Sequence, residues 1–308
     1  MSPSRREFLR MMVHAGAALP LASHAFSQQD AEPIIATNLA DNVFLVTGAG
    51  SNVVAVSGPD GLLVVDGGVA ERSADLLRVL HEHSGVTRIQ TLFNTHWHHD
   101  HAGLNATLGK AGTKIVSHEN TKLWLGEEVW VEWQNRTYKP LPAEALPGQT
   151  FYTSGKMKFG DQDIEYGLLP MAHTDGDIYV YLRKANVLVA GDVVSVGSYP
   201  VLDYTSGGWI GGLADATKTL AGLANAETRI VPGTGDVRKK AHLDAQLAMC
   251  TEMRTRLVKL MKQGMGPRDM IAAAPSKDFD GEWGNADLFI SNAYRGMWGH
   301  VRELGGIV

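Results

Sequence analysis

The residues at 94–101 constrain this chain most, because they place four histidines and one aspartate directly after an apolar run at 89–93. Neutral imidazole and carboxylate are ligands that Zn²⁺ prefers. An H-x-H-x-D-H spacing lets alternate side chains converge from a tight turn that is not helical. A histidine cluster on the surface is the competing interpretation, but such clusters rarely follow a buried strand or carry a carboxylate in phase. The pattern therefore predicts a metal site with four candidate ligands: His96, His98, Asp100 and His101.

The H-x-H-x-D-H motif resembles the signature of the metallo-β-lactamase superfamily of metallohydrolases. Three further motifs follow the order found in that family. Asp66 begins an Asp-Gly turn after the apolar run at 62–65, His173 stands in an H-T-x-G-D-like context, and Asp192 ends the Gly-Asp that follows the run at 187–190. Four motifs in this order are far more specific than any one of them alone.

The resemblance also implies roles for these side chains. It implies a first zinc held by His96, His98 and His173, and a second site formed by Asp100, His101 and a bridging Asp192. Asp100 is the candidate catalytic residue, because with an empty second site it would orient the hydroxide and carry its proton to the leaving group. Asp66 would orient the ligand turn by accepting hydrogen bonds. We therefore expect one or two zinc ions per chain.

The chain departs from the family pattern at a fifth motif, which is Pro-Gly-His-Gly in the family. The chain reads Pro-Gly-Thr-Gly at 232–235, so Thr234 stands where the ligand histidine is expected. A hydroxyl is a poor zinc ligand, and Asp236 or His242 could replace it, although His242 also fits a solvated helix face. Thr234 could instead donate a hydrogen bond to the hydroxide or to a substrate oxygen. The second site is therefore expected to lack one imidazole.

The order of the elements predicts the fold. Short β-type runs at 43–47, 52–57 and 62–66 precede a pattern of helical period at 71–84. A second set of strands follows at 164–170, 178–183 and 187–190, and helices are expected over 212–225 and 239–263. This order predicts an α+β protein, an αββα four-layer sandwich of the metallo-β-lactamase type, with ligands on loops at one sheet edge.

Residues 1–27 have the form of a twin-arginine signal peptide. Arg5 and Arg6 precede an apolar stretch at 11–22, which is shorter than the roughly 20 apolar residues that a bilayer requires. Cleavage fits after Ala25 or Ser27, and an amphipathic N-terminal helix is the alternative. We expect export through the twin-arginine machinery to a bacterial periplasm, without a stable membrane span, and a hydrolase domain over 33–308.

Two aromatic segments are candidates for lining the substrate cleft. Residues 119–150 are rich in tryptophan and proline, and form a flap over the metals, an interface in a homo-oligomer, or ordinary packing. Tyr199, Tyr204 and Trp209 lie in a glycine-rich loop that follows Asp192. We expect these three side chains to line the cleft.

The motifs predict a zinc-dependent hydrolase that uses a metal-activated hydroxide to cleave an ester, lactone or thioester-like bond in a small molecule. One alternative is a β-lactam hydrolase. Another is a mononuclear iron enzyme that resembles the persulfide dioxygenases, which the missing histidine favours. A third is a metal-binding protein on the same fold without catalysis. The net charge of −5 and the lack of a basic run argue against nucleic acid as a partner.

Overall fold

The computed structural model describes residues 32–305 of the chain. All described helices and strands lie in one compact unit, Ile34–Val308. The signal peptide expected over 1–27 lies outside the described residues. No helix within residues 32–305 is long and apolar enough to cross a membrane.

The first sheet has seven strands in the order β1, β2, β3, β4, β5, β6, β9. Their bounds are β1 Ile35–Ala40, β2 Val43–Thr47, β3 Val53–Gly58, β4 Gly61–Val65, β5 Ile89–Phe93, β6 Lys114–His118 and β9 Gln149–Phe151. The first four strands pair antiparallel through short connections, whereas β4, β5 and β6 run parallel. Parallel neighbours require crossovers, and α2 (Ser73–Ser84) and α3 (Asn105–Lys110) provide them.

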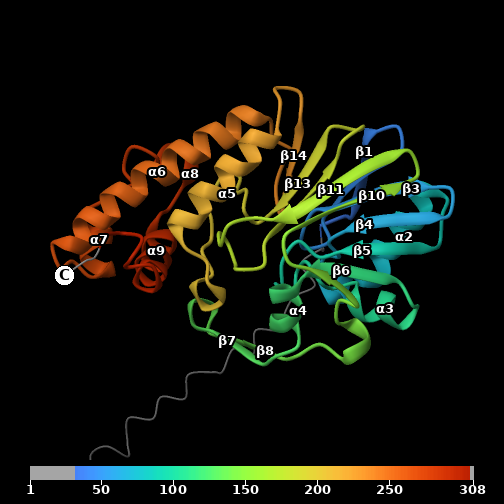
Figure 1. Cartoon of the computed structure of the whole chain (residues 1–308), viewed down its shortest axis with the longest axis horizontal. Helices are drawn as coiled ribbons and strands as arrows, with labels where there is room; N and C mark the ends of the chain where they lie inside the picture. The colour runs from blue at the N-terminus through green and yellow to red at the C-terminus, as the bar shows by residue number, and fades with distance from the viewer. Residues whose placement is uncertain (1–31, 306–308) are drawn as a thin grey trace, which may run out of the picture. The chain divides into compact units, whose positions relative to one another are not determined.

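The second sheet has five strands: β10 Ser154–Phe159, β11 Gln162–Leu168, β12 Ile178–Leu182, β13 Val187–Gly191 and β14 Arg229–Pro232. The first four strands pair antiparallel, and β13 and β14 pair parallel. Helix α5 (Ile210–Leu223) makes the crossover, and α6 (Lys240–Lys262) follows β14. In Figure 1, α5 and α6 lie on one side of the strands and α2 and α3 on the other.

Alternation of side chains along the strands creates the layers. In β4, Leu63 belongs to the core between the two sheets, and Leu62 to the core under α2. In β13, Val189 faces the first sheet and Leu188 packs with the helices of the opposite layer. Successive side chains of a strand point to opposite faces, so the central strands of both sheets are buried on both sides. The predicted αββα sandwich is confirmed.

The aromatic segment between β6 and β9 has its own small core. It contains α4 (Glu119–Leu125) and a hairpin of β7 (Val129–Val131) and β8 (Arg136–Tyr138), with the 3-10 turn η2 (Glu132–Gln134) at its tip. Its core contains Leu125, Val129, Val131 and Tyr138, which cluster with Trp97 and Ala102 of the metal turn. The hairpin therefore packs directly against the segment that carries the histidines.

The helical layer behind the second sheet continues to the end of the described chain. Three further helices, α7 Pro267–Ala272, α8 Asp280–Trp283 and α9 Asp287–Gly299, pack with α5 and α6. Asn292 of α9 donates a hydrogen bond to the Leu202 carbonyl at 3.0 Å. The last helix thus contacts the loop that follows Asp192.

Cys250 provides a direct test of this helical layer. It is fully buried on α6, and burial raises the pKa of its thiol. Because only an exposed thiolate reacts readily, we expect no reaction with Ellman's reagent in native buffer and one thiol per chain in denaturant. Rapid stoichiometric labelling of the native protein would show that α6 is not packed as described.

Candidate metal centre

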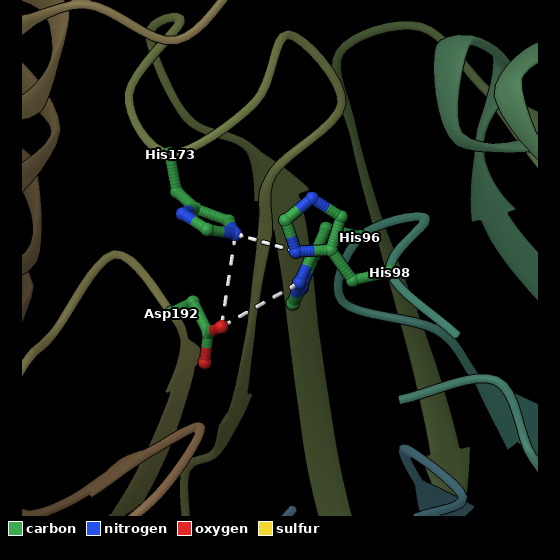
Figure 2. A group of neighbouring side chains, drawn as sticks. All are labelled: His96, His98, His173 and Asp192. Atoms are coloured by element: carbon green, nitrogen blue, oxygen red, sulfur yellow. Dashed lines mark hydrogen bonds and ion pairs between the residues drawn. The ribbon is translucent and has the colours of Figure 1, made fainter. Parts of the chain in front are cut away.

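Four side chains from both sheets converge at one end of the sandwich. His96 and His98 follow β5, His173 lies between β11 and β12, and Asp192 follows β13. Their potential ligand atoms all lie within 4.8 Å of one another. His173 Nε2 lies 3.0 Å from His98 Nδ1 and 3.6 Å from Asp192 Oδ2 (Figure 2). Such spacing suits one ion at the usual zinc distances of about 2.0–2.2 Å from nitrogen and oxygen.

Hydrogen bonds on the far side of the rings determine which nitrogen of His98 and of His173 faces the space between the four side chains. His98 Nε2 donates to Asp203 Oδ2 at 3.1 Å, and His173 Nδ1 donates to the Val201 carbonyl at 2.8 Å. The two nitrogens that face each other at 3.0 Å therefore both carry lone pairs when the rings are neutral. Two facing lone pairs repel unless a cation or a proton lies between them. The chemistry of this pair fits a metal ion.

Asp66 holds the neighbouring histidines through the turn at the end of β4. Its carboxylate accepts hydrogen bonds from Thr95 N and Oγ1, both at 2.8 Å, and from His101 Nδ1 at 2.9 Å. Thr95 Oγ1 thus has a lone pair free to accept from His96 Nδ1 at 3.1 Å. His96 Nε2 is buried and has no hydrogen-bond partner within the described chain. Asp66 therefore orients two imidazoles toward the centre without facing it, as the family resemblance implies.

A second group of ligand atoms shares Asp192 with the first. Asp192 Oδ2 lies 3.8 Å from His96 Nε2, whereas Oδ1 lies 3.3 Å from His101 Nε2. Asp100 Oδ2 is 3.9 Å from the same His101 nitrogen. Burial alone would lower the pKa of His101, but Asp192 and Asp66 raise it well above its usual value. Asp192 thus has one oxygen toward each group, as a bridging carboxylate requires.

The structure does not place His242 at the second group. His242 Nε2 donates to the Ser195 carbonyl at 2.7 Å, and its ring lies 5.4 Å from that of Trp283 in the helical layer. Thr234 and Asp236 lie exposed on the turn after β14. Of the two replacements that the sequence left open, neither His242 nor Asp236 lies among these ligand atoms, and the second group consists of Asp100, His101 and Asp192.

Gly233, next to Thr234, leaves space for the shared carboxylate. A Cβ at this position would lie 1.8 Å from Asp192 Oδ1 and 2.9 Å from His101 Cε1. Gly233→Ala should therefore displace Asp192 and weaken metal binding about 10- to 100-fold, as loss of a supporting contact does. Competition with a chelator measures this, and Gly222→Ala, where nothing lies within 4 Å, is the control. Equal affinity in both variants would contradict the role of Asp192.

Two of the three aromatic side chains expected in the cleft lie in the helical layer instead. Tyr199 is buried and stacks on Phe289, with ring centroids 5.1 Å apart. Trp209 is buried and stacks on His300 at 4.0 Å. Tyr204 lies between the hairpin and α9, and its hydroxyl donates to Glu132 at 3.0 Å. The prediction is wrong for Tyr199 and Trp209, because the loop leads into α5 and turns these rings toward the helical layer.

Asp203 is a site residue that was not predicted, and it lies fully buried beneath His98. Its carboxylate accepts hydrogen bonds from His98, from Ser206 Oγ at 2.6 Å and from Trp133 Nε1 at 3.3 Å. Burial alone would raise the pKa of Asp203, but the His98 contact holds it well below its usual value. Asp203 therefore remains an anion that orients His98. Its only sequence signal was a carboxylate in a glycine-rich loop, at no spacing that connects it to the motifs.

Two facing sheets covered by helices, with histidines and carboxylates at one edge, define an αββα protein with a candidate metal site. The family model of the metallo-β-lactamase superfamily matches residues 46–238. The chain belongs to this superfamily. No curated protein sequence matches it.

Solved structures share this fold at low sequence identity. A metallo-β-lactamase from Pontibacter korlensis is 20% identical with a TM-score of 0.58, covering 71% of this chain and 99% of its own. The DIM-1 metallo-β-lactamase is 18% identical with a TM-score of 0.56, covering 71% and 97%. A double mutant of the sec-alkyl sulfatase PisA1 is 14% identical with a TM-score of 0.68, covering 86% of this chain and 50% of the sulfatase chain.

Proposed function

We propose that this protein is a zinc-dependent hydrolase that cleaves an ester, lactone or thioester-like carbonyl bond in a small molecule. The observation that carries the proposal is the convergence of three imidazoles and Asp192, with inward nitrogens whose outer partners leave only lone pairs at the centre. His96, His98 and His173 would hold the first ion. Asp192 would reach it and also the second group, with His101 and Asp100.

Bound zinc supplies a Lewis acid and lowers the pKa of a coordinated water from about 15.7 to about 7. The side chains supply position and proton transfer. Asp100 is 45% exposed, in contrast to the buried histidines, so it is accessible to substrate and solvent. From there it would orient the attacking water and carry a proton to the leaving group. No nucleophilic side chain is required.

Metal analysis tests this proposal. Protein purified without a histidine tag should contain one or two zinc ions per chain by plasma mass spectrometry. Dialysis against a chelator should abolish hydrolysis, and added zinc should restore it. The substrate panel contains lactones, thioesters and aryl esters, with β-lactams and secondary alkyl sulfates added because of the enzymes named above. One iron per chain with oxygen consumption on a persulfide, and no hydrolysis, would overturn the proposal.

We also propose that residues 1–27 direct export to the periplasm. The Arg5-Arg6 pair ahead of the apolar stretch at 11–22 supports this, because it has the form of a twin-arginine signal. Cell fractionation should find the native protein in the periplasm and a variant with both arginines replaced by lysine in the cytoplasm. Equal distribution of the two would contradict the proposal.

A further inference from the structure

A cavity of about 420 Å³ opens beside Asp100, and its chemistry indicates what part of the substrate it accepts. Its polar lining consists of Glu71, His99, Asp100, Gln134, Arg136 and Tyr138. One wall is the metal turn and the opposite wall is the hairpin β7–β8. We propose that this cavity binds a carboxylate carried by the substrate, and that Arg136 determines this specificity. The inference rests on the proposed hydrolase function.

Arg136 is a cation without an acidic partner. Among residues 32–305, no ion pair includes its guanidinium. Its Cζ instead lies 4.6 Å from the centroid of the Tyr138 ring. Stacking on an aromatic face orients a guanidinium and leaves the N–H groups at its edge available. Those N–H groups match a carboxylate in two parallel hydrogen bonds.

The ring beneath Arg136 is itself fixed. Tyr138 is buried in the hairpin core, and its hydroxyl donates to Gln134 Oε1 at 2.6 Å. His99 packs on its ring, with centroids 4.8 Å apart. A cation on a rigid platform binds an anion at a lower entropic cost than one on a mobile chain. Arg136 is therefore preorganised within the cavity.

The hairpin is also held from behind. Glu132 Oε2 accepts hydrogen bonds from Tyr204 Oη at 3.0 Å and from Arg295 Nη1 of α9 at 2.9 Å. The next residue, Trp133, donates to Asp203, the carboxylate that orients His98. Hydrogen bonds through Asp203 therefore connect the hairpin that carries Arg136 to the metal centre.

Glu71 is the charge that opposes this assignment, because it is an exposed carboxylate in the same cavity. It repels an anionic substrate and would instead attract a cationic one. The cavity contains two carboxylates, and Asp100 belongs to the metal group. Glu71 is therefore the side chain whose charge opposes that of Arg136, so the two residues favour ligands of opposite charge. The experiment therefore compares both residues.

Two 4-nitrophenyl esters of equal chain length test the proposal, mono-4-nitrophenyl glutarate as the anionic member and 4-nitrophenyl pentanoate as the neutral one. Arg136→Gln should lower kcat/KM for the glutarate ester about 10- to 100-fold, the effect of a hydrogen bond to a charged group, and spare the pentanoate ester. Glu71→Gln should raise the preference for the anionic ester. Lys139→Gln, which removes the same charge from a neighbour paired with Glu128, should leave the preference unchanged.

A binding measurement separates this inference from the proposed hydrolysis. Glutarate titrated calorimetrically into the zinc-loaded protein should bind, and Arg136→Gln should weaken it by a similar factor. If neither ester is cleaved but glutarate binding depends on Arg136, the hydrolase proposal fails and the carboxylate site stands. Glutarate affinity that is the same in wild type and variant, or a preference for the neutral ester in wild type, would overturn the inference.

Discussion

Replacing His96 with alanine should remove the bound metal and reduce turnover at least about 1,000-fold, because the pKa of water returns from about 7 to about 15.7 without the ion. His96 Nε2 is a buried lone pair with no hydrogen-bond partner within the described chain, so the side chain has no other polar function at this atom. Asp66 and Thr95 orient the ring toward the centre from the opposite side. Metal content by plasma mass spectrometry and kcat on the best ester are the two measurements.

The control is His83→Ala, which removes a histidine from α2 on the outer surface. His83 Nε2 contacts Asn38 at 2.7 Å and has no role at the metal groups. This variant should keep both the metal and the activity. A His96→Ala protein that retains one zinc per chain and wild-type turnover would show that the ligand set is misassigned.

Asp203→Ala is expected to have the largest effect on stability. It would leave N–H groups of His98 and Trp133 and the Ser206 hydroxyl without their common acceptor in a fully buried site. Each buried donor left without its acceptor costs about 1–3 kcal/mol, and these three donors share this carboxylate. Loss of the carboxylate behind a metal-binding histidine also weakens metal affinity about 10- to 100-fold. Urea unfolding measures the first effect and chelator competition the second.

Two comparisons make this result specific. Asp203→Asn keeps an acceptor of the same size without the charge, so it should reduce the free energy of unfolding and the metal affinity less than Asp203→Ala does. Asp215→Ala removes an exposed carboxylate from α5 and should change the free energy of unfolding by no more than about 0.5 kcal/mol. Unchanged unfolding and metal affinity in Asp203→Ala would refute the orienting role.

Continuous apolar runs predicted the strands that are buried on both faces. The runs that became β2, β3, β4, β12 and β13 are almost entirely buried, so their apolar residues gave a clear signal. β1 escaped prediction, because it is an edge strand with no buried side chain and therefore needs no apolar run. The hairpin β7–β8 also escaped, since strands of three residues are too short to show a period.

In the candidate site, too, the residues that could be predicted are those marked by local spacing, and those that could not are placed by contacts between distant parts of the chain. His96 and His98 could be found because their spacing within one turn is itself the signal. Asp203 could not, because its contact with His98 spans 105 residues and depends on how the two sheets meet. The rings of Tyr199 and Trp209 follow a strand whose two faces point to different layers, and the sequence does not show which layer a loop side chain joins.

The hydrogen bond between Arg295 and Glu132 connects residues 163 positions apart and joins α9 to the wall of the substrate cavity. The family model ends at residue 238, so this helix lies beyond the part of the chain that the superfamily model matches. Selection for a new substrate could therefore act on α9, moving the hairpin without altering any residue that touches metal or ligand. In directed evolution of this protein, beneficial changes should accumulate around residues 288–298 as well as within the cavity.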